Sequence, residues 1–379
     1  MSETKLSTPC YVFDIPALIK RAKSISAALG KIKLCYAVKA NPTVIADIFE
    51  YVDCLEVCSM GEYRICERAG VPAEKIVLSG VYKEESDIRS VISKCGDKPL
   101  YTVESPSQFD LLSKLAVETK LTLSVCLRLS SGNQFGMDKA TLLECAAKQG
   151  ENLKVRGIQY YSGTQKKPEK MRDEIALLIQ FCRELERTCG YPCERIEYGP
   201  GLSVSYFQSD APVDERAVLE LIKEEFGAYY GEVVIESGRF LVADCGTYYT
   251  SAVDLKQTGN ANYCIVDGGI NHLNYYGQTM AMKLPFVDKI SADGICTYDM
   301  KNYTVCGSLC TTADVLVRSL PIGGLKVGDI LAFHKAGAYS VTEGVYLFLS
   351  RDMPRIYKVN RDGETVLWRD VVHTDRFNG

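Results

Sequence analysis

The sequence is poor in histidine and tryptophan, with three His and one Trp among 379 residues. Sixteen cysteines are present, and Cys54/Cys58 and Cys189/Cys193 form close pairs. Neither pair has a matching second pair or a nearby histidine, so the spacing of a zinc site is missing and we expect no metal. The remaining cysteines lie mostly inside apolar runs, which is typical of buried free thiols.

Long apolar runs and clusters of basic residues are also missing. No run approaches the roughly 18 apolar residues of a membrane helix, and the first residues, MSETK, are polar and lack the apolar core of a signal peptide. The net charge is −4 and the isoelectric point about 5.7, with no basic stretch for nucleic acid or a lipid surface. We therefore expect neither partner, and we expect the reducing cytoplasm as the location.

The first two thirds of the chain alternate between apolar runs with the length of strands and segments with helical spacing. A chain of this length is too long for one ordinary core and fits two domains or a barrel with an appendage. Strands are predicted at 34–38, 54–57, 76–78, 100–103, 122–128, 157–161, 195–197 and 233–236, and helices at 15–29, 42–52, 61–69, 83–94, 107–119, 139–149 and 169–189. Eight strands, each followed by a helix or a loop, predict a closed (β/α)8 barrel of the TIM type.

After about residue 244 the pattern changes, because strands follow one another with few helices between them. These strands are predicted at 248–255, 262–266, 301–305, 330–333, 345–348 and 355–357. They predict a second, mainly antiparallel β domain that also takes the strand at 8–13 from the other end of the chain. The predicted division is a barrel over residues 22–245 and a β domain over residues 1–21 and 246–379.

Lys39 ends the apolar run 32–38, and Asn41 and Pro42 then stop the strand. A lysine at the end of a buried strand is desolvated on one side, which disfavours the ammonium form and favours a nucleophilic amine. That is the chemistry of a lysine that forms a Schiff base. The stretch by itself also fits a solvated lysine at the end of a strand.

Chemistry in such a barrel lies where the strands end. Three of these ends carry glycine turns: QYYSGTQ at 159–165, EYGPG at 197–201 and ESGR at 236–239. Backbone N–H groups can approach an anion closely where no side chain intervenes, so these turns are candidates for a phosphate cradle. Glycine turns taken singly also fit tight barrel loops.

Five segments, in chain order, resemble motifs of the pyridoxal-phosphate decarboxylases of the ornithine/diaminopimelate decarboxylase type (fold type III). They are YAVKANP at 36–42, EVCSMGE at 56–62, ESGRFLV at 236–242, CGSLCTTAD at 306–314 and GAY at 337–339. The resemblance implies the barrel and β domain predicted above, pyridoxal phosphate as the cofactor, and a head-to-tail homodimer with shared active sites to which the β domain contributes.

The resemblance also assigns roles in binding the cofactor. Lys39 would form the imine with pyridoxal phosphate, and Glu236 would pair with the pyridine nitrogen and keep it protonated, which makes the ring an electron sink. The phosphate would be held by Thr164, Gly201, Gly238 and Tyr339. Arg239 would join them or bind a substrate carboxylate. Glu236 also fits an ordinary acid that pairs with Arg239.

Cys310 would come from the partner subunit and return a proton to the α-carbon after carbon dioxide leaves. The other interpretation of Cys310 is one more buried thiol. Asp314 would lie near the substrate side chain or support Cys310, and it also fits an aspartate that caps a loop.

Three departures from the family pattern concern the substrate. Tyr161 stands where the family has a histidine that stacks on the cofactor ring; a phenol can stack but carries no positive charge at neutral pH. Thr311 replaces the acid that binds a distal ammonium group in members specific for ornithine and diaminopimelate. Tyr275 replaces the arginine that binds the distal carboxylate of diaminopimelate. Both groups that read a distal charge are therefore absent.

The segment DGGINH at 267–272 and the Tyr161, Gly163–Gln165 pattern are more similar to the branch of the butirosin-pathway decarboxylase, which acts on an aminoacyl group attached to a carrier protein. A tethered substrate needs no ion pair at its far end, and neither does a small or uncharged amino acid. The resemblance therefore predicts decarboxylation of an α-amino acid or an α-aminoacyl conjugate. Other hypotheses are decarboxylation of diaminopimelate or another diamino acid, an alanine racemase, and a catalytically silent homologue that binds a partner protein as antizyme inhibitors do.

Overall fold

The computed structural model describes residues 6–294 and 299–379. Contacts divide the chain into two compact units, and each unit draws on separate parts of the sequence. The barrel unit comprises residues 19–203 and 214–241. The β unit comprises residues 1–18, 204–213 and 242–379, so the short segment 204–213 belongs to it although it lies between barrel elements in the sequence.

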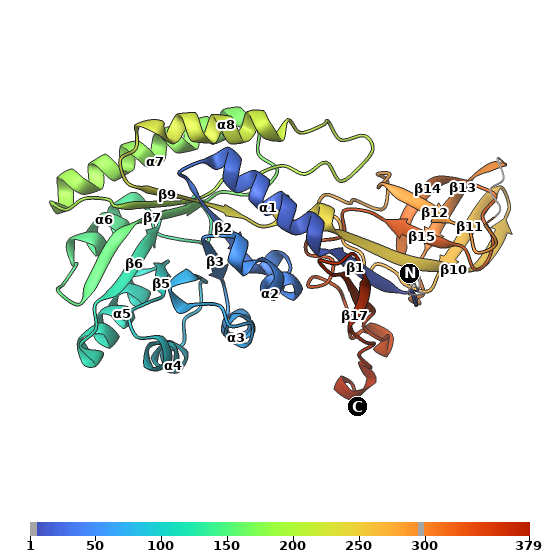
Figure 1. Cartoon of the computed structure of the whole chain (residues 1–379), viewed down its shortest axis with the longest axis horizontal. Coiled ribbons are helices and arrows are strands. Elements are labelled where there is room, and N and C mark those ends of the chain that lie inside the picture. The colour runs from blue at the N-terminus through green and yellow to red at the C-terminus, as the bar shows by residue number, and fades with distance from the viewer. Residues whose placement is uncertain (1–5, 295–298) are drawn as a thin grey trace. The chain divides into compact units, whose positions relative to one another are not determined.

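The barrel unit contains eight parallel strands that close on themselves (Figure 1). The strands are β2 (Lys33–Ala37), β3 (Cys54–Val57), β4 (Ile76–Leu78), β5 (Leu100–Val103), β6 (Leu123–Arg128), β7 (Leu153–Tyr161), β8 (Arg195–Gly199) and β9 (Glu232–Ser237). Pairing of β2 with β9, in which Cys35 lies opposite Glu236, closes the ring. The predicted TIM-type barrel is confirmed, and its inner layer includes Cys35, Cys54, Val77 and Val234, each at most 6% exposed.

The helices of the barrel unit lie outside these strands, as Figure 1 shows for α3 to α8. The α-helices within the described residues are α1 (Ile15–Leu29), α2 (Ile45–Ile48), α3 (Met60–Arg68), α4 (Glu85–Cys95), α5 (Pro106–Thr119), α6 (Lys139–Ala147), α7 (Pro168–Cys189), α8 (Glu215–Glu225) and α9 (Arg239–Val242). Several begin with a side-chain cap: Ser59, Ser105, Asp138 and Asp214 each accept a hydrogen bond from an amide of the first turn.

The β unit contains a nine-stranded, mainly antiparallel sheet, as predicted. Its strands are β1 (Cys10–Asp14), β10 (Gly246–Thr258), β11 (Ala261–Val266), β12 (Val287–Ile290), β13 (Met300–Cys306), β14 (Val315–Gly323), β15 (Ile330–Phe333), β16 (Arg355–Val359) and β17 (Thr365–Arg369). Strand β1 lies between β10 and β16, antiparallel to the first and parallel to the second. The expectation that the N-terminal strand joins this sheet is therefore confirmed.

Two local predictions are wrong. Residues 345–348 form no strand; Val345 is 61% and Leu347 48% exposed, and this apolar run pairs with no other described segment. The helix predicted over 42–52 is divided into short pieces, with α2 (Ile45–Ile48) between single 3-10 turns. Pro42 has no amide hydrogen and starts the first of these turns, whose cap is the Asn41 side chain.

Candidate active site

Lys39 lies in a 3-10 turn (Val38–Ala40) directly after β2. Its Nζ donates to Glu56 Oε2 at 3.2 Å, lies 3.8 Å from the Cys58 sulfur, and is 5.9 Å from the centre of the Tyr161 ring. The side chain is 44% exposed, so the desolvation predicted for it from the strand-end position is not observed. Lys39 lies in the turn, beyond the buried end of the strand, and the Glu56 carboxylate orients its amine.

Glu56, on β3, is only 2% exposed. Burial opposes its ionisation, but the Lys39 ammonium group and its hydrogen bond, followed by the charge of Arg128, outweigh burial and hold the pKa of Glu56 below its ordinary value. Glu56 is therefore an anion at neutral pH that fixes the position of the lysine amine. Glu56 belongs to the motif-like segment 56–62, but the resemblance assigns no role to this residue.

Glu236 has the opposite character. Burial, together with the charges of Glu56 and Glu197, raises the pKa of Glu236 to about 8, although Lys39 and a hydrogen bond from Gln159 act against the shift. The Gln159 amide nitrogen lies 3.0 and 3.2 Å from the two Glu236 oxygens. Glu236 thus holds a proton at neutral pH, in a position fixed by a neutral donor from β7, with β8 between the two strands.

Two glycine turns at the ends of β7 and β8 pack backbone against backbone. A Cβ on Gly201, which has φ +62°, would lie 2.1 Å from the carbonyl oxygen of Gly163. A Cβ on Gly199 would lie 2.6 Å from a carbon of the Tyr161 ring and 3.3 Å from a Glu236 oxygen. A side chain at Gly199 would therefore clash with Tyr161 and crowd Glu236, and one at Gly201 would clash with the Gly163–Thr164 backbone.

The other predicted cofactor residues of the barrel lie at the same edge. Thr164 is in the loop after β7, and Gly238 lies between β9 and α9, which Arg239 begins. Thr164, Gly238 and Arg239 are all half-buried. The carboxyl ends of β7, β8 and β9 thus bring together six residues predicted from the sequence: Tyr161, Thr164, Gly201, Glu236, Gly238 and Arg239.

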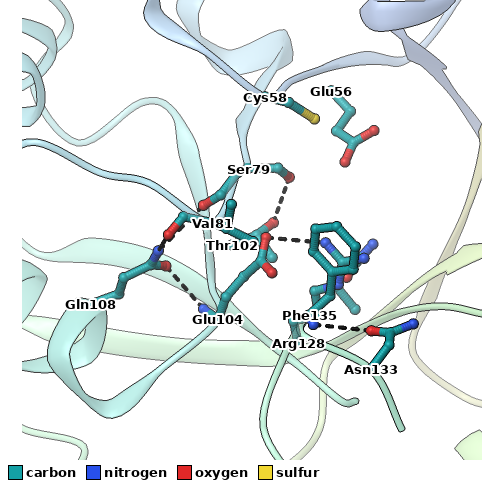
Figure 2. A network of polar contacts seen from close by, with 12 residues as sticks. Glu56, Cys58, Ser79, Val81, Thr102, Glu104, Gln108, Arg128, Asn133 and Phe135 are labelled. Carbon is teal, nitrogen blue, oxygen red and sulfur yellow. Dashed lines mark hydrogen bonds and ion pairs between the residues drawn. The ribbon is translucent and has the colours of Figure 1, made fainter. Parts of the chain in front are cut away.

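A second polar network lies at the ends of β3 to β6 (Figure 2). Arg128, at the end of β6, pairs with Glu104 at 3.1 Å, and the two side chains are 10% and 4% exposed. The ring of Phe135 lies 4.8 Å from the guanidinium carbon, and the Gln108 side chain accepts from the Glu104 amide. The sequence analysis missed this network, whose signal is a charged residue directly after the apolar runs of β5 and β6.

The predicted residues of the β unit lie around the loop between β13 and β14. Cys310 and Thr311 are exposed, whereas Asp314 is 2% exposed. Asp314 accepts hydrogen bonds from the amides of Ile270 at 2.8 Å and Leu309 at 2.7 Å. These contacts match the other interpretation of Asp314, an aspartate that caps a loop, and its role near the substrate or Cys310 stays a prediction.

Tyr275 is 4% exposed, and its hydroxyl donates to the His334 carbonyl at 2.5 Å. It lines a pocket of about 470 Å³ within the β unit, together with Asn274, Gln278, Thr312, Ala313 and Arg318 among others. Tyr339 lies in the left-handed region with φ +66°, and its carbonyl accepts from the amides of Thr342 and Glu343.

The barrel edge fits the predicted cofactor by its chemistry. Gly199 and Gly201 let the backbone pack closely beside an aromatic ring, a protonated carboxyl and a lysine amine. These are the groups that a planar pyridine with an aldehyde and a phosphate requires. Over residues 6–294 and 299–379, no group of three His, Cys, Asp or Glu side chains could hold a metal ion.

No helix within the part of the chain that the structure describes is long and apolar enough to span a membrane. The fifteen described cysteines are all free thiols.

Comparisons with known proteins identify the family. Residues 16–243 match the family model described as pyridoxal-dependent decarboxylase, pyridoxal binding domain. The chain is 27% identical to the diaminopimelate decarboxylase of Zymomonas mobilis over 88% of this chain and 84% of that protein. It is 26% identical to the L-glutamyl-[BtrI acyl-carrier protein] decarboxylase of Niallia circulans over 96% of this chain and 91% of that protein.

Solved structures show the same fold. The diaminopimelate decarboxylase of Helicobacter pylori, in complex with L-lysine, has a TM-score of 0.86 at 21% identity and covers 98% of this chain and 96% of its own. The enzyme of M. jannaschii, also with L-lysine, has a TM-score of 0.86 at 23% identity, covering 97% and 90%. The chain therefore belongs to the pyridoxal-dependent decarboxylases of fold type III, which act on amino acids with pyridoxal phosphate as the cofactor.

Proposed function

We propose that this enzyme decarboxylates an α-aminoacyl group that carries no free charge at its far end, in particular one tethered to a carrier protein. The observation that carries the proposal is the identity of Tyr275 and Thr311 at the two positions where relatives read a distal charge. Thr311 has no charge, and the hydroxyl of Tyr275 already donates to a backbone carbonyl. A substrate with a distal ammonium or carboxylate would therefore lose its ion pair at both positions.

The Niallia circulans relative, whose name states a glutamyl group on an acyl-carrier protein, supports the same substrate class. In a tethered glutamyl group one carboxylate is consumed by the linkage. The diaminopimelate decarboxylases have similar identity and support the alternative, a free diamino acid.

We assign the cofactor to the barrel edge. Lys39 would hold pyridoxal phosphate covalently, Tyr161 would stack on its ring, and Thr164, Gly201, Gly238 and Arg239 would bind its phosphate. The bound cofactor supplies an electron sink for the bond that breaks at the α-carbon. Glu56 would orient the Lys39 amine through the hydrogen bond seen at 3.2 Å.

Glu236 would supply the charge balance at the opposite end of the cofactor. With a pKa of about 8 it holds a proton at neutral pH, which it can share with a pyridine nitrogen. Gln159 holds both carboxyl oxygens, so the proton is presented from a fixed position. Because the site is of low polarity, the hydrogen bonds between Gln159 and Glu236 are stronger than they would be in water.

Cys310 would return a proton to the α-carbon from a neighbouring subunit, which makes a homodimer with shared sites part of the proposal. The thiol is exposed on the β unit, and the Asp314 carboxylate fixes the start of its loop through the Leu309 amide. The free thiols support a reducing compartment, and we propose the cytoplasm.

Release of carbon dioxide from a panel of substrates tests the proposal. The purified protein should be yellow, and borohydride should fix the cofactor to Lys39. We expect release from a carrier-bound glutamyl or related aminoacyl group, and slower release from the same amino acid in free form. Release from meso-diaminopimelate alone would contradict our interpretation of Tyr275 and Thr311. A colourless protein in the presence of added cofactor would instead support a silent, partner-binding homologue.

A further inference from the structure

Lys166 is a buried lysine two residues beyond Thr164, and the function described above does not use it. Its side chain is 6% exposed. Nζ donates to Glu174 Oε2 at 2.7 Å and to the carbonyl of Gly199 at 3.2 Å. Burial lowers the pKa of Lys166, while Glu174 acts in the opposite direction and supports the charged form.

Glu174, on α7, is 3% exposed and has a partner at each oxygen. Oε2 accepts from the Tyr198 hydroxyl at 2.7 Å as well as from Lys166, and Oε1 accepts from the Ser162 hydroxyl. A buried carboxylate with this many donors is fixed in place. Lys170 also lies 3.8 Å from Oε1, but its side chain is 60% exposed and therefore well solvated.

Lys166 lies in the loop of the glycine turn after β7, and its hydrogen bonds reach the glycine turn after β8. Its amide donates to the carbonyl of Gly201 at 3.1 Å, its Nζ to that of Gly199, and its carbonyl accepts from Ser203 Oγ at 3.1 Å. It is also part of the loop that contains Gly163, which packs against Gly201. One residue therefore ties together the turn after β7 and the turn after β8.

Lys166 also approaches the ring predicted to stack on the cofactor. Its Nζ lies 5.7 Å from the centre of the Tyr161 ring and 5.4 Å from that of Tyr198, while Lys39 lies 5.9 Å from Tyr161. These distances are within the range of cation–π attraction. Tyr161, which lacks the charge of the family histidine, thus has two lysine cations beside it.

We propose that Lys166 is a positioning residue for the phosphate end of pyridoxal phosphate: it fixes the two glycine turns and Tyr161, and its buried charge favours the phosphate dianion. A cation shielded from water acts over a longer distance than an exposed one because solvent and salt screen it less. The inference concerns the cofactor and does not depend on the substrate proposed above.

Titration of the cofactor-free protein with pyridoxal phosphate and with pyridoxal, followed by the absorbance of the bound ligand, tests this role. In K166Q, which can keep a hydrogen bond to Gly199 but has no charge, the affinity for pyridoxal phosphate should fall about tenfold and that for pyridoxal by less than about twofold. K166R should restore most of the difference. K170M, at the exposed lysine beside the same carboxylate, is the matched control and should leave both affinities unchanged.

The ratio of the two affinities separates this role from a purely structural one. An equal loss for both ligands in K166Q would mean that the loop has only lost its shape, and no loss for either would mean that the charge is irrelevant; both overturn the proposal. If K166Q does not fold, E174Q provides the test. It keeps the cation, so pyridoxal phosphate should remain favoured over pyridoxal at least as strongly as in the native protein, and a weakened preference overturns the proposal.

Discussion

The pKa values of strand-end carboxylates are shifted in opposite directions on the two sides of the barrel edge. At the end of β3, Glu56 lies against Lys39, and at the end of β5, Glu104 lies against Arg128. At the end of β9, Glu236 is held by the neutral amide of Gln159, and its pKa is raised to about 8, whereas that of Glu56 is lowered. All three are glutamates at strand ends; Glu56 and Glu104 are buried, and Glu236 is half-buried.

The difference shows that the group beside a strand-end acid, more than burial, determines whether the acid is ionised or protonated. A carboxylate beside a cation stays ionised and holds a neighbouring group in position. A carboxylate beside an amide and two other acids keeps a proton that it can share with a base. The following experiments test this contrast.

Replacement of Lys39 should have the largest effect. In K39A we expect no borohydride-stable cofactor and a fall in decarboxylation of at least about 10⁴-fold, because the covalent attachment is lost. Lys33, at the other end of β2, forms an exposed ion pair with Glu232 and provides the control. K33A should keep both the absorbance and the activity. Normal cofactor attachment in K39A would remove Lys39 from the site.

Breaking the Glu104–Arg128 pair should mainly reduce stability. R128M leaves the Glu104 carboxylate buried without its cation, and we expect the free energy of unfolding to fall by about 3–5 kcal/mol. Urea unfolding of the cofactor-free protein measures this change. Arg89 on α4 pairs with Glu85 on the surface, so R89M should barely change the unfolding midpoint. Similar effects in the two variants would mean that the buried pair is no more important than the exposed one.

Glu236→Gln should retain the cofactor but lower the decarboxylation rate by about 10²–10³-fold, because an amide cannot share a proton with the pyridine nitrogen in the same way.

Cys310→Ala should also retain the yellow cofactor and lose clean formation of the amine. Analysis of the product and of the absorbance spectrum distinguishes the two variants. An unchanged product and rate in C310A would exclude this thiol from the mechanism.

The two acids should also give opposite dependences of stability on pH. The fold raises the pKa of Glu236, so the folded protein binds a proton that the unfolded chain releases between about pH 4.5 and 8. Its contribution to stability is complete below that window and is lost as the pH rises through it. We expect the difference in unfolding free energy between the native protein and E236Q to decline steadily from pH 5 to 9.

For Glu56 the sign is reversed. Its pKa is lowered in the fold, so its contribution is present above the ordinary pKa of a glutamate and is lost on acidification. The difference between the native protein and E56Q should therefore decline toward low pH. Urea unfolding of the cofactor-free proteins across this range measures both slopes. Parallel slopes for E56Q and E236Q would contradict the contrast drawn here.

The barrel could be predicted from the sequence because parallel strands buried on both faces form short continuous apolar runs that turn residues end. The same rule failed for residues 345–348, which are apolar but exposed. It also missed β12, β14 and β17. The β17 side chains are largely exposed, and β14 contains Pro321, which cannot donate to a strand partner.

Site residues that belong to motifs were found, whereas those defined only by contacts were not. Lys39 and Glu236 carry recognisable neighbours along the chain. Gln159, Arg128 and Lys166 acquire their roles from groups on other strands and helices, such as the Glu236 carboxylate 77 residues away from Gln159. No local pattern encodes such proximity.

Strand β1 has a consequence for biosynthesis. It leaves the ribosome long before its parallel partner β16 is translated. All eight barrel strands are complete by Ser237, well before β16 exists. The barrel can therefore fold during translation while β1 waits with an unpaired edge, and we expect chaperone binding in nascent chains to persist there until residues 355–359 emerge.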